Sequence, residues 1–528
     1  MFVLSTAVVA SHRVAIGRAF VVERGVAPRA VEACDRSALE CFNEALAQSR
    51  EQIESLACGN DIFEAHLEMI DDPMIAEAVA EGIEQGMDAV EAVRCACEQI
   101  VAMFEAIDDE YLRARKDDVR DIFARIEANL LGGVENPFEG VQQGDIVVDR
   151  ELFPSDMALL DLNSIGGFVT ALGSTTSHIC IVARNHSLAA VVGVGEAVGQ
   201  IATGQTVIVD GAQGRVVVEP DEATLTLYRE QMAQAEREAQ LQGAVAHQSV
   251  SYRGKPIKVY ANAGSVEDVE RAVAAGADGI GLFRSEFLYI SSSVEPTEEE
   301  QYEAYLAAVR ACQGRVLTIR TLDIGGDKAV PYLNFEREEN PFLGWRAIRV
   351  SLECREMFHR QLRALLRASA HGSVRVMFPM ISCLEELKQA KAELELCKGQ
   401  LETEGVAFDR NIEVGVMIET PAAVLVADSL ACECDFFSIG TNDLTQYIMA
   451  ADRANSRVAK LYNPYSKAVL RAVEMTLDAA DRADIECGMC GELASDSAAT
   501  AMLADMGLSE FSVNVGAVAE IKWTISKL

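Results

Sequence analysis

Glu413-Val-Gly-Val-Met-Ile418 is a short, mostly apolar run, and Phe436-Phe-Ser-Ile439 is the next one along the chain, with space for a helix between them. Short apolar runs of this kind are typical of fully buried strands. Six further runs with similar spacing follow residue 257: Lys258-Val-Tyr-Ala261, Gly279-Ile-Gly-Leu-Phe283, Val316-Leu-Thr-Ile319, Val374-Arg-Val-Met-Phe378, Glu486-Cys-Gly-Met489 and Glu510-Phe-Ser-Val513. Eight strands that alternate with helices predict a (β/α)8 barrel of the TIM type over residues 251–528.

Ahead of the barrel, β-like segments flank a long helical block. Residues 1–24 contain short β segments, and β character returns between residues 144 and 219. Between them, apolar residues recur at three- and four-residue steps, which is the helical period. We therefore expect an α/β domain made of residues 1–24 and 140–220, with an all-helical domain over residues 25–139 inserted into it.

A single helix is expected to link these parts to the barrel. The segment from Pro220 to about Gln242 is charged, rich in Gln, Glu and Ala, and followed by Gly243. Glycine after a helical pattern is a common stop signal, so we predict that the helix ends before Gly243. The linker is assigned to residues 221–250.

The charge of the chain limits the kinds of partner that it is expected to bind. The 528 residues carry a formal net charge of −36 at pH 7, which argues against nucleic acid because phosphate backbones attract Lys/Arg-rich faces. Between Glu32 and Glu127 there are 25 acidic and 8 basic residues, so the helical block carries much of this charge. Such a surface can steer a basic partner.

The sequence predicts a cytoplasmic protein. The first residues, MFVLSTAVVASHRVAIG, resemble a signal peptide, but they lack a positive start and continue into further strand-like sequence. No run of 18 apolar residues occurs, so no transmembrane helix is expected. The 14 cysteines are scattered through apolar stretches, which favours free thiols in a reducing compartment.

Polar residues follow the predicted barrel strands, where barrel active sites lie. They comprise Arg284 after the second strand, Arg320 with Asp323 and Lys328 after the third, Glu419 after the fifth, Asn442 and Asp443 after the sixth, and Cys490 after the seventh. Arg346 and Arg453 lie in segments that could fold over the same face. Arginines suit a ligand with phosphate and carboxylate groups, and two carboxylates suit Mg²⁺. A surface ion-pair network is the simpler alternative.

His178 stands in Gly173-Ser-Thr-Thr-Ser-His-Ile-Cys-Ile-Val-Ala-Arg184, a small polar loop that enters an apolar helix start. Hydroxyls and helix N-terminal amides could hold a phosphoryl group there, and a neutral imidazole nitrogen is a competent nucleophile. A histidine at a helix start is more often a capping or surface residue, so this loop alone does not decide the chemistry.

Together these segments resemble enzyme I of the bacterial phosphoenolpyruvate (PEP)-dependent sugar phosphotransferase system, over essentially the whole chain. The most specific segments are Thr176-Ser-His-Ile-Cys-Ile-Val-Ala-Arg184 and Asp435-Phe-Phe-Ser-Ile-Gly-Thr-Asn-Asp-Leu-Thr-Gln446 through Asp452-Arg453. Supporting segments are Gly281-Leu-Phe-Arg-Ser-Glu-Phe-Leu288, Arg320-Thr-Leu-Asp-Ile-Gly-Gly-Asp-Lys328, Asn340-Pro-Phe-Leu-Gly-Trp-Arg346, Gly488-Met-Cys-Gly-Glu492 and Asp108-Asp-Glu-Tyr-Leu112 through Asp118-Val-Arg-Asp-Ile122.

The resemblance implies a phosphotransferase with a histidine acceptor. PEP and Mg²⁺, or Mn²⁺, would bind at the barrel mouth, with the metal on Glu419 and Asp443. His178 would attack phosphorus through Nε2, and Cys490 would protonate the enolate to give pyruvate. The groups implied to hold PEP are Arg284, Arg320, Lys328, Arg346, Asn442 and Arg453.

The resemblance also implies partners and movement. The phosphohistidine domain would swivel away from the barrel, and the inserted helical domain would present His178 to the phosphocarrier protein HPr. His66 could lie on that acidic face, although an ordinary amphipathic-helix position is an equal alternative. The family dimerises through the barrel. Its members usually continue for a few more helical turns beyond the position of Leu528, so the resemblance does not decide how strong a dimer this chain forms.

Departures from the family pattern leave alternatives open. Ser174 and Thr175 stand where Gly and Arg are usual, Ala189 replaces a proline, and Ser11-His-Arg-Val-Ala-Ile-Gly17 replaces Ser-Pro-Gly-Ile-Ala-x-Gly. A catalytically weak or silent HPr-binding regulatory homologue would fit the altered loop. A relative of pyruvate, phosphate dikinase or PEP synthase fits less well, because those enzymes need a large ATP-binding domain ahead of the histidine domain. The residues that stand there in this sequence are expected to be helical, and no nucleotide-binding loop is evident among them.

Overall fold

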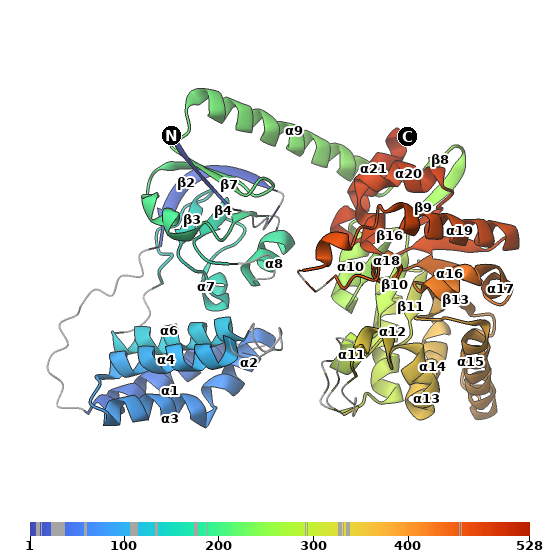
Figure 1. Cartoon of the computed structure of the whole chain (residues 1–528), viewed down its shortest axis with the longest axis horizontal. Helices are drawn as coiled ribbons and strands as arrows, with labels where there is room; N and C mark the ends of the chain where they lie inside the picture. Colours follow the sequence, from blue (N-terminus) through green and yellow to red (C-terminus); the bar gives the residue numbers. More distant parts are fainter. Residues whose placement is uncertain are drawn as a thin grey trace. The chain divides into compact units, whose positions relative to one another are not determined.

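The computed structural model describes the whole chain except residues 7–10, 12, 23–36, 57–60, 106–114, 133–135, 174–177, 187, 291, 293, 326–329, 331, 334–337, 454 and 456. Two compact units make up the chain, Met1–Ala235 and Glu236–Leu528. The element labels follow Figure 1.

The first unit contains a seven-stranded sheet with the order β1-β7-β6-β2-β3-β4-β5. The strands are β1 (Phe2–Ser5), β2 (Val14–Val21), β3 (Ile146–Asp149), β4 (Gly167–Thr170), β5 (Ala189–Val191), β6 (Thr206–Asp210) and β7 (Arg215–Val218). Strands β2 to β5 are parallel, whereas β1, β7, β6 and β2 pair in antiparallel fashion. The β segments predicted at both ends of this region are thus confirmed, and they share one sheet. The helices α7 (Pro154–Leu159) and α8 (His178–Asn185) and the 3₁₀ helix η1 (Gly195–Gln200) accompany it.

A bundle of helices lies between β2 and β3 in sequence, as the helical period predicts. It contains α1 (Ala38–Leu56), α2 (Asp61–Ile70), α3 (Pro73–Glu84), α4 (Ala89–Glu105) and α6 (Lys116–Leu130). Pro73 begins α3, and the side chain of Asp72 caps it by accepting a hydrogen bond from the Met74 amide at 2.8 Å. The bundle has its own apolar core, which includes Phe42, Ile53 and Phe123.

Helix α9 (Glu222–Ala246) follows the sheet, and it corrects one prediction. The helix does not end before Gly243 but continues to Ala246. A side chain at Gly243 would meet no atom within 4 Å, so the position is open, and one exposed glycine costs a helix only about 1 kcal/mol. Ala246 is buried, and its carbonyl oxygen would lie 2.3 Å from a Cβ at Gly276, so close packing against the barrel unit holds the last turn.

The second unit is a closed barrel, as predicted. Parallel pairing runs from β9 round to β16, and β9 pairs with both β10 and β16. The strands are β9 (Lys255–Ala263), β10 (Ile280–Arg284), β11 (Leu317–Arg320), β12 (Val374–Phe378), β13 (Glu413–Ile418), β14 (Phe436–Ile439), β15 (Glu486–Met489) and β16 (Glu510–Asn514). Strand β8 (Val250–Tyr252) adds a hairpin to β9.

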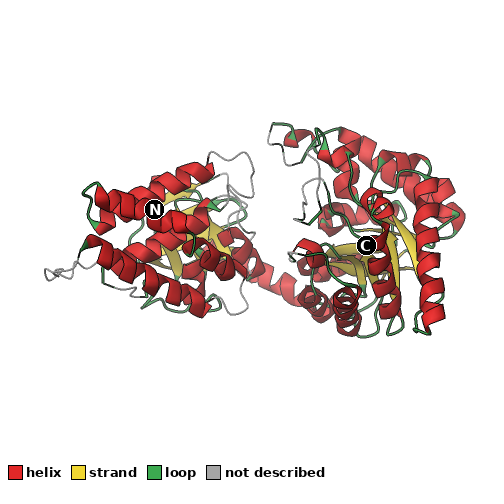
Figure 2. Cartoon of the chain, turned by 90° about the horizontal axis from the view of Figure 1, so that it is seen from below, coloured by secondary structure: helices red, strands yellow, loops and turns green. Residues whose placement is uncertain are grey.

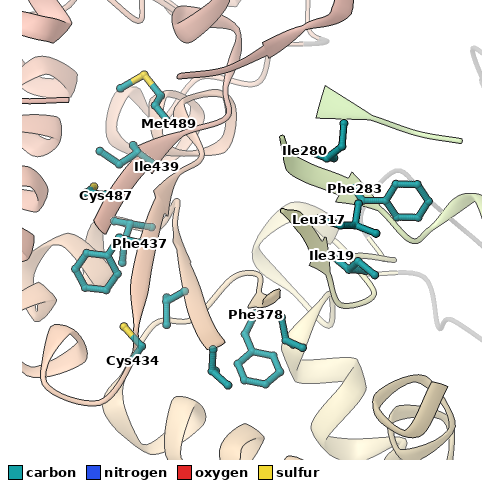
Figure 3. Packing of buried hydrophobic residues seen from close by; sticks show 14 of the residues in the cluster. Ile280, Phe283, Leu317, Ile319, Phe378, Cys434, Phe437, Ile439, Cys487 and Met489 are labelled. Atoms are coloured by element: carbon teal, nitrogen blue, oxygen red, sulfur yellow. The ribbon is translucent and has the colours of Figure 1, made fainter. Parts of the chain in front are cut away.

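Helices surround these strands, so that the yellow strands of the barrel lie inside a ring of red helices in Figure 2. They are α10 (Val266–Ala274), α11 (Phe287–Ile290), α12 (Glu298–Ala311), α13 (Ile348–Glu353), α14 (Arg355–Ser369), α15 (Leu384–Glu404), α16 (Pro421–Leu425), α17 (Ala427–Ala431), α18 (Thr441–Met449), α19 (Lys467–Ala483), α20 (Ser497–Asp505) and α21 (Val518–Lys527). The 3₁₀ helices are η2 (Pro341–Leu343), η3 (Ala459–Leu461), η4 (Glu492–Ser495) and η5 (Val515–Ala517). Buried strand residues such as Ile280, Ile319 and Phe437 form the core of the barrel unit (Figure 3).

None of the helices in the described part of the chain is both long and apolar enough to cross a bilayer.

Candidate active site

The C-terminal ends of the barrel strands bring most of the predicted site residues into one unit. Arg284 and Arg320 are the last residues of β10 and β11, and Glu419 and Cys490 directly follow β13 and β15. Asn442 and Asp443 lie in the first turn of α18 (Thr441–Met449). Since the strands of a parallel barrel end on the same side, these side chains surround one mouth.

Two buried arginines form the cationic part of the mouth. Arg320 pairs with Glu286, and its Nη1 lies 3.1 Å from Asp323 Oδ2. Arg346 Nη2 lies 3.0 Å from Asp323 Oδ1 and 3.7 Å from Asp443 Oδ2. Asp323 therefore joins the two guanidinium groups, and neighbouring carboxylates raise both arginine pKa values although burial opposes this.

Both arginines keep an unused donor. The Nε atoms of Arg320 and Arg346 are buried and have no hydrogen-bond partner among the described residues. A buried donor without a partner costs about 1–3 kcal/mol, so such atoms are usually paired. Two of them at the same end of the barrel indicate a place for an anionic ligand, for which arginine offers forked donors.

Glu419 and Asp443 form the acidic part of the mouth. Glu419 is buried, and its Oε1 accepts a hydrogen bond from the Met380 amide at 2.6 Å. Met380 holds this position with a φ of 56°, a strained value for a non-glycine residue. Burial, and then the charge of Asp443, raises the pKa of Glu419 to about 8. The buried Oδ1 of Asp443 has no partner among the described residues.

These features fit a hard divalent cation. A cation beside two carboxylates would offset their mutual repulsion and give the free Asp443 oxygen a ligand role. Clusters of three or more potential metal ligands are absent from the described part of the chain. Glu419 and Asp443 are the residues that could hold such a cation.

Cys490 lies among buried apolar side chains. It is 5% exposed and belongs to a cluster inside the barrel that includes Leu282, Met377 and Met417. Burial raises the pKa of the Cys490 thiol to about 11, and the charge of Glu419 adds to this, whereas Arg320 lowers it. The thiol is therefore protonated at neutral pH. This state suits a proton donor, whereas a nucleophilic cysteine would need to be a thiolate.

The remaining predicted contacts are more open. Arg284 is exposed and forms no ion pair with any described residue, and Arg453 is also exposed. Asn442 is half-buried, and its Oδ1 accepts a hydrogen bond from the Glu492 amide at 2.9 Å. Lys328 lies outside the described residues, so its predicted role stays a prediction.

His178 is the first residue of α8 in the first unit. The helix is anchored by Ile179, Cys180 and Ala183, which are buried in a core cluster of the α/β body, that is, the seven-stranded sheet with its helices α7 and α8. Its N-terminal end, where backbone amides favour an anion, is the end that carries His178. Residues 174–177 and the side chain of His178 lie outside the description, so the effect of Ser174 and Thr175 stays open.

The structure adds residues that the sequence did not single out. Glu286 is buried and pairs with Arg320, and Tyr447 accepts a hydrogen bond from Arg346 Nη1 at 3.2 Å. Glu286 follows β10 by two residues, in the same kind of position as the predicted residues, and that spacing is the signal that could have found it. Tyr447 lies at the far end of α18 and carries no such signal.

His66 does not lie on an acidic outer face, so the alternative, an ordinary position on an amphipathic helix, holds. It is 1% exposed, and its Nε2 lies 3.2 Å from Asp118 Oδ1. Its Nδ1 lies 3.9 Å from Asp121, a buried carboxylate that also accepts hydrogen bonds from Ser155. Asp121 belongs to α6 and Ser155 to α7, so this network joins the helical bundle to the α/β body.

Comparison with known protein families identifies three matching domains. The PEP-binding domain of PEP-utilising enzymes matches residues 238–528, their N-terminal domain matches residues 6–115, and their mobile domain matches residues 141–214. The chain therefore has the domains of a PEP-utilising enzyme.

Comparison with individual proteins shows to which group of PEP-utilising enzymes the chain belongs. A phosphoenolpyruvate-protein phosphotransferase of Bacillus sp. (strain S) is 41% identical over 99% of this chain and 92% of its own length. The protein of the same name from Bacillus subtilis is 41% identical over 92% of this chain and 87% of its own, and that from Haemophilus influenzae is 42% identical over 87% and 80%. The chain belongs to the phosphoenolpyruvate-protein phosphotransferase family, that is, enzyme I of the phosphotransferase system.

Proposed function

We propose that this protein transfers the phosphoryl group of PEP to its own His178, releases pyruvate, and passes the group to a histidine of HPr, the first step of sugar uptake by the phosphotransferase system. The observation that carries the proposal is the barrel mouth, where buried cations with unused donors, two buried carboxylates and a neutral thiol stand together. A surface ion-pair network would lack these unused buried atoms, since exposed groups find water.

PEP carries a phosphate and a carboxylate, and the mouth offers donors for both. Arg320 and Arg346 would bind through their free Nε atoms, and Arg284 adds a cation without an ion pair among the described residues. Asn442, Arg453 and Lys328 would provide the remaining contacts to PEP. Clustered positive charge stabilises the charge that spreads over the phosphoryl oxygens in the transition state.

Glu419 and Asp443 would hold the metal, which we propose to be Mg²⁺, with Mn²⁺ as a substitute. When bound, the cation neutralises negative charge on the substrate and its transition state. The Met380 amide fixes one oxygen of Glu419, and the other would face the cation.

The chemical step uses two residues of the chain. A ring nitrogen of His178 attacks phosphorus, the bond from phosphorus to the enol oxygen breaks, and its electron pair stays on the enolate. The methylene carbon of the enolate then takes the proton of the Cys490 thiol, which leaves a thiolate and pyruvate. The raised pKa of Cys490, about 11, keeps that proton on sulfur until the enolate forms.

Transfer to HPr requires His178 to reach a second protein, so we propose that the α/β body swivels and that the helical bundle binds HPr. The bundle region is strongly acidic, with 25 acidic and 8 basic residues between Glu32 and Glu127, which suits a basic partner surface. We further propose a homodimer formed through the barrel and a cytoplasmic location.

One experiment tests the proposal. The intact protein is incubated with ³²P-labelled PEP and Mg²⁺, with and without HPr, beside the variant His178→Ala. We expect acid-labile label on the wild type, loss of label when HPr is added, and no label on the variant. Binding of HPr without any labelling would support a silent regulatory homologue instead, and label that requires ATP would support a dikinase-like enzyme.

A further inference from the structure

Cys490 is held in place from two sides of the barrel. Its amide donates a hydrogen bond to the carbonyl oxygen of Ile439 at 3.1 Å, at the end of the neighbouring strand β14. Its own carbonyl oxygen accepts a hydrogen bond from Asn262 Nδ2 at 3.0 Å. Asn262 belongs to β9, the first strand of the barrel, so the loop after β15 is tied across the strand that lies between, β16.

Ser512 determines which end of the Asn262 amide faces Cys490. The Ser512 hydroxyl on β16 is fully buried and donates to Asn262 Oδ1 at 2.7 Å. With its oxygen engaged in this way, Asn262 presents its NH₂ group to the Cys490 carbonyl. Gly281 leaves space for this pair, since a Cβ there would lie 2.5 Å from Ser512 Oγ.

The residue after Cys490 is equally constrained. A Cβ at Gly491 would lie 1.9 Å from Thr441 Oγ1, so the chain turns here in close contact with the first residue of α18. The loop is thus packed on one side by Thr441 and hydrogen-bonded on the other by Asn262. Loss of the Asn262 hydrogen bond would leave the carbonyl of a buried residue without its side-chain donor.

We infer that Asn262, oriented by Ser512, is a positioning residue that holds the Cys490 thiol at the carbon it protonates. The inference rests on the proposed function. Proton transfer to carbon needs donor and acceptor in near-contact, and a shift of about 1 Å can cost about 100-fold in rate. The described hydrogen bonds of the Asn262 side chain go to the Cys490 carbonyl and Ser512, not to Glu419 or Asp443. Its loss should therefore affect the protonation step and leave phosphoryl transfer intact.

Three variants test this in the full-length protein. Asn262→Asp keeps the shape but has no NH₂ group to donate, Asn262→Ala removes the side chain, and Ser512→Ala removes only the orienting hydroxyl. Asn514→Ala is the matched control, because Asn514 pairs with Asn262 in register on β16 but is exposed. Circular dichroism checks that each variant folds.

The first readout separates the two half-steps in a single turnover. We expect ³²P label to reach His178 at the wild-type rate in every folded variant, with the concentration of PEP for half-maximal rate changed less than about two-fold. Pyruvate detected with lactate dehydrogenase should form about 10-fold or more slowly in the Asn262 variants, and less so in Ser512→Ala. Equal losses of label and pyruvate would mean a merely structural role and would overturn the inference.

The second readout needs no activity. Alkylation of Cys490 by iodoacetamide, quantified by peptide mass spectrometry at one fixed pH, should be at least about five-fold faster in the Asn262 variants than in the wild type or Asn514→Ala, because a released loop exposes the thiol. If the wild type takes no label from PEP, the proposed function fails while this readout still tests the tether. Unchanged alkylation and unchanged pyruvate formation would refute the positioning role.

Discussion

Glu510 offers a prediction about stability that does not depend on any substrate. It begins β16 at the base of the barrel, is buried, and has its Oε2 3.8 Å from Arg375 Nη1. Burial raises the pKa of Glu510 from 4.5 to about 7; Arg375 opposes the shift, and the charge of Glu486 adds to it. The folded protein therefore keeps a proton on Glu510 at pH values where the unfolded chain has lost it.

The sign of the effect follows from this difference. A carboxyl whose pKa is raised by folding contributes stability that is fully present below about pH 4.5 and is lost as the pH rises through about 7. At about 1.4 kcal/mol per pKa unit, the shift from 4.5 to about 7 corresponds to roughly 3 kcal/mol. The variant Glu510→Gln is neutral at every pH, so its free energy of unfolding should rise relative to the wild type by up to about 3 kcal/mol between about pH 5 and pH 8.

Tryptophan fluorescence is a suitable assay because both tryptophans of the chain, Trp345 and Trp523, belong to the barrel unit. Urea unfolding is followed at several pH values for the wild type, Glu510→Gln and the control Glu413→Gln. Glu413 pairs with the same Arg375 but its side chain is 48% exposed, so its loss should change stability by less than about 1 kcal/mol at every pH. A constant difference between Glu510→Gln and the wild type across this range would refute the reasoning.

Three further predictions concern the mouth. Arg346→Met should lower the rate of PEP-dependent labelling by at least about 100-fold, measured by rapid quench, because a preorganised donor to the transferring group is lost; labelling within about five-fold of wild type would contradict this. Asp443→Asn should weaken Mn²⁺ binding at least about 10-fold in an electron paramagnetic resonance titration, and unchanged binding would exclude this carboxylate as a ligand. Cys490→Ala should keep the labelling of His178 but slow pyruvate formation by about 100-fold, and a normal pyruvate rate would remove the thiol from the mechanism.

The barrel could be predicted from the sequence because its strands are buried on both faces. Such strands are continuous apolar runs, as in Val414 to Ile418, and an apolar run needs no knowledge of its neighbours to be recognised. The same periodicity placed Glu419 and Cys490 at strand ends, and the closure of the barrel then brought them to one side. Strand ends and the parallel arrangement together are enough to predict a shared mouth.

Other features depend on contacts between segments distant in sequence. His66 lies on an amphipathic helix, and only the packing of α6 against it decides that it is buried beside Asp118 and Asp121. The hydrogen bond from Asn262 to Cys490 spans 228 residues of sequence. Gly243 stays helical because Ala246 finds a packing partner in the barrel unit, and local stop signals are overridden by tertiary contacts of this kind.

The two ends of the barrel differ in how their buried arginines are paired. At the base, Arg375 lies among Glu413, Glu486 and Glu510, so that a cation is surrounded by carboxylates within the protein. At the mouth, Arg320 and Arg346 also pair with carboxylates, yet each keeps a buried donor without a described partner. Unused buried donors lower stability, and they are expected to persist where a ligand supplies the missing partner. The unused donors at the mouth are therefore the ones that the proposed binding of a small anion would satisfy.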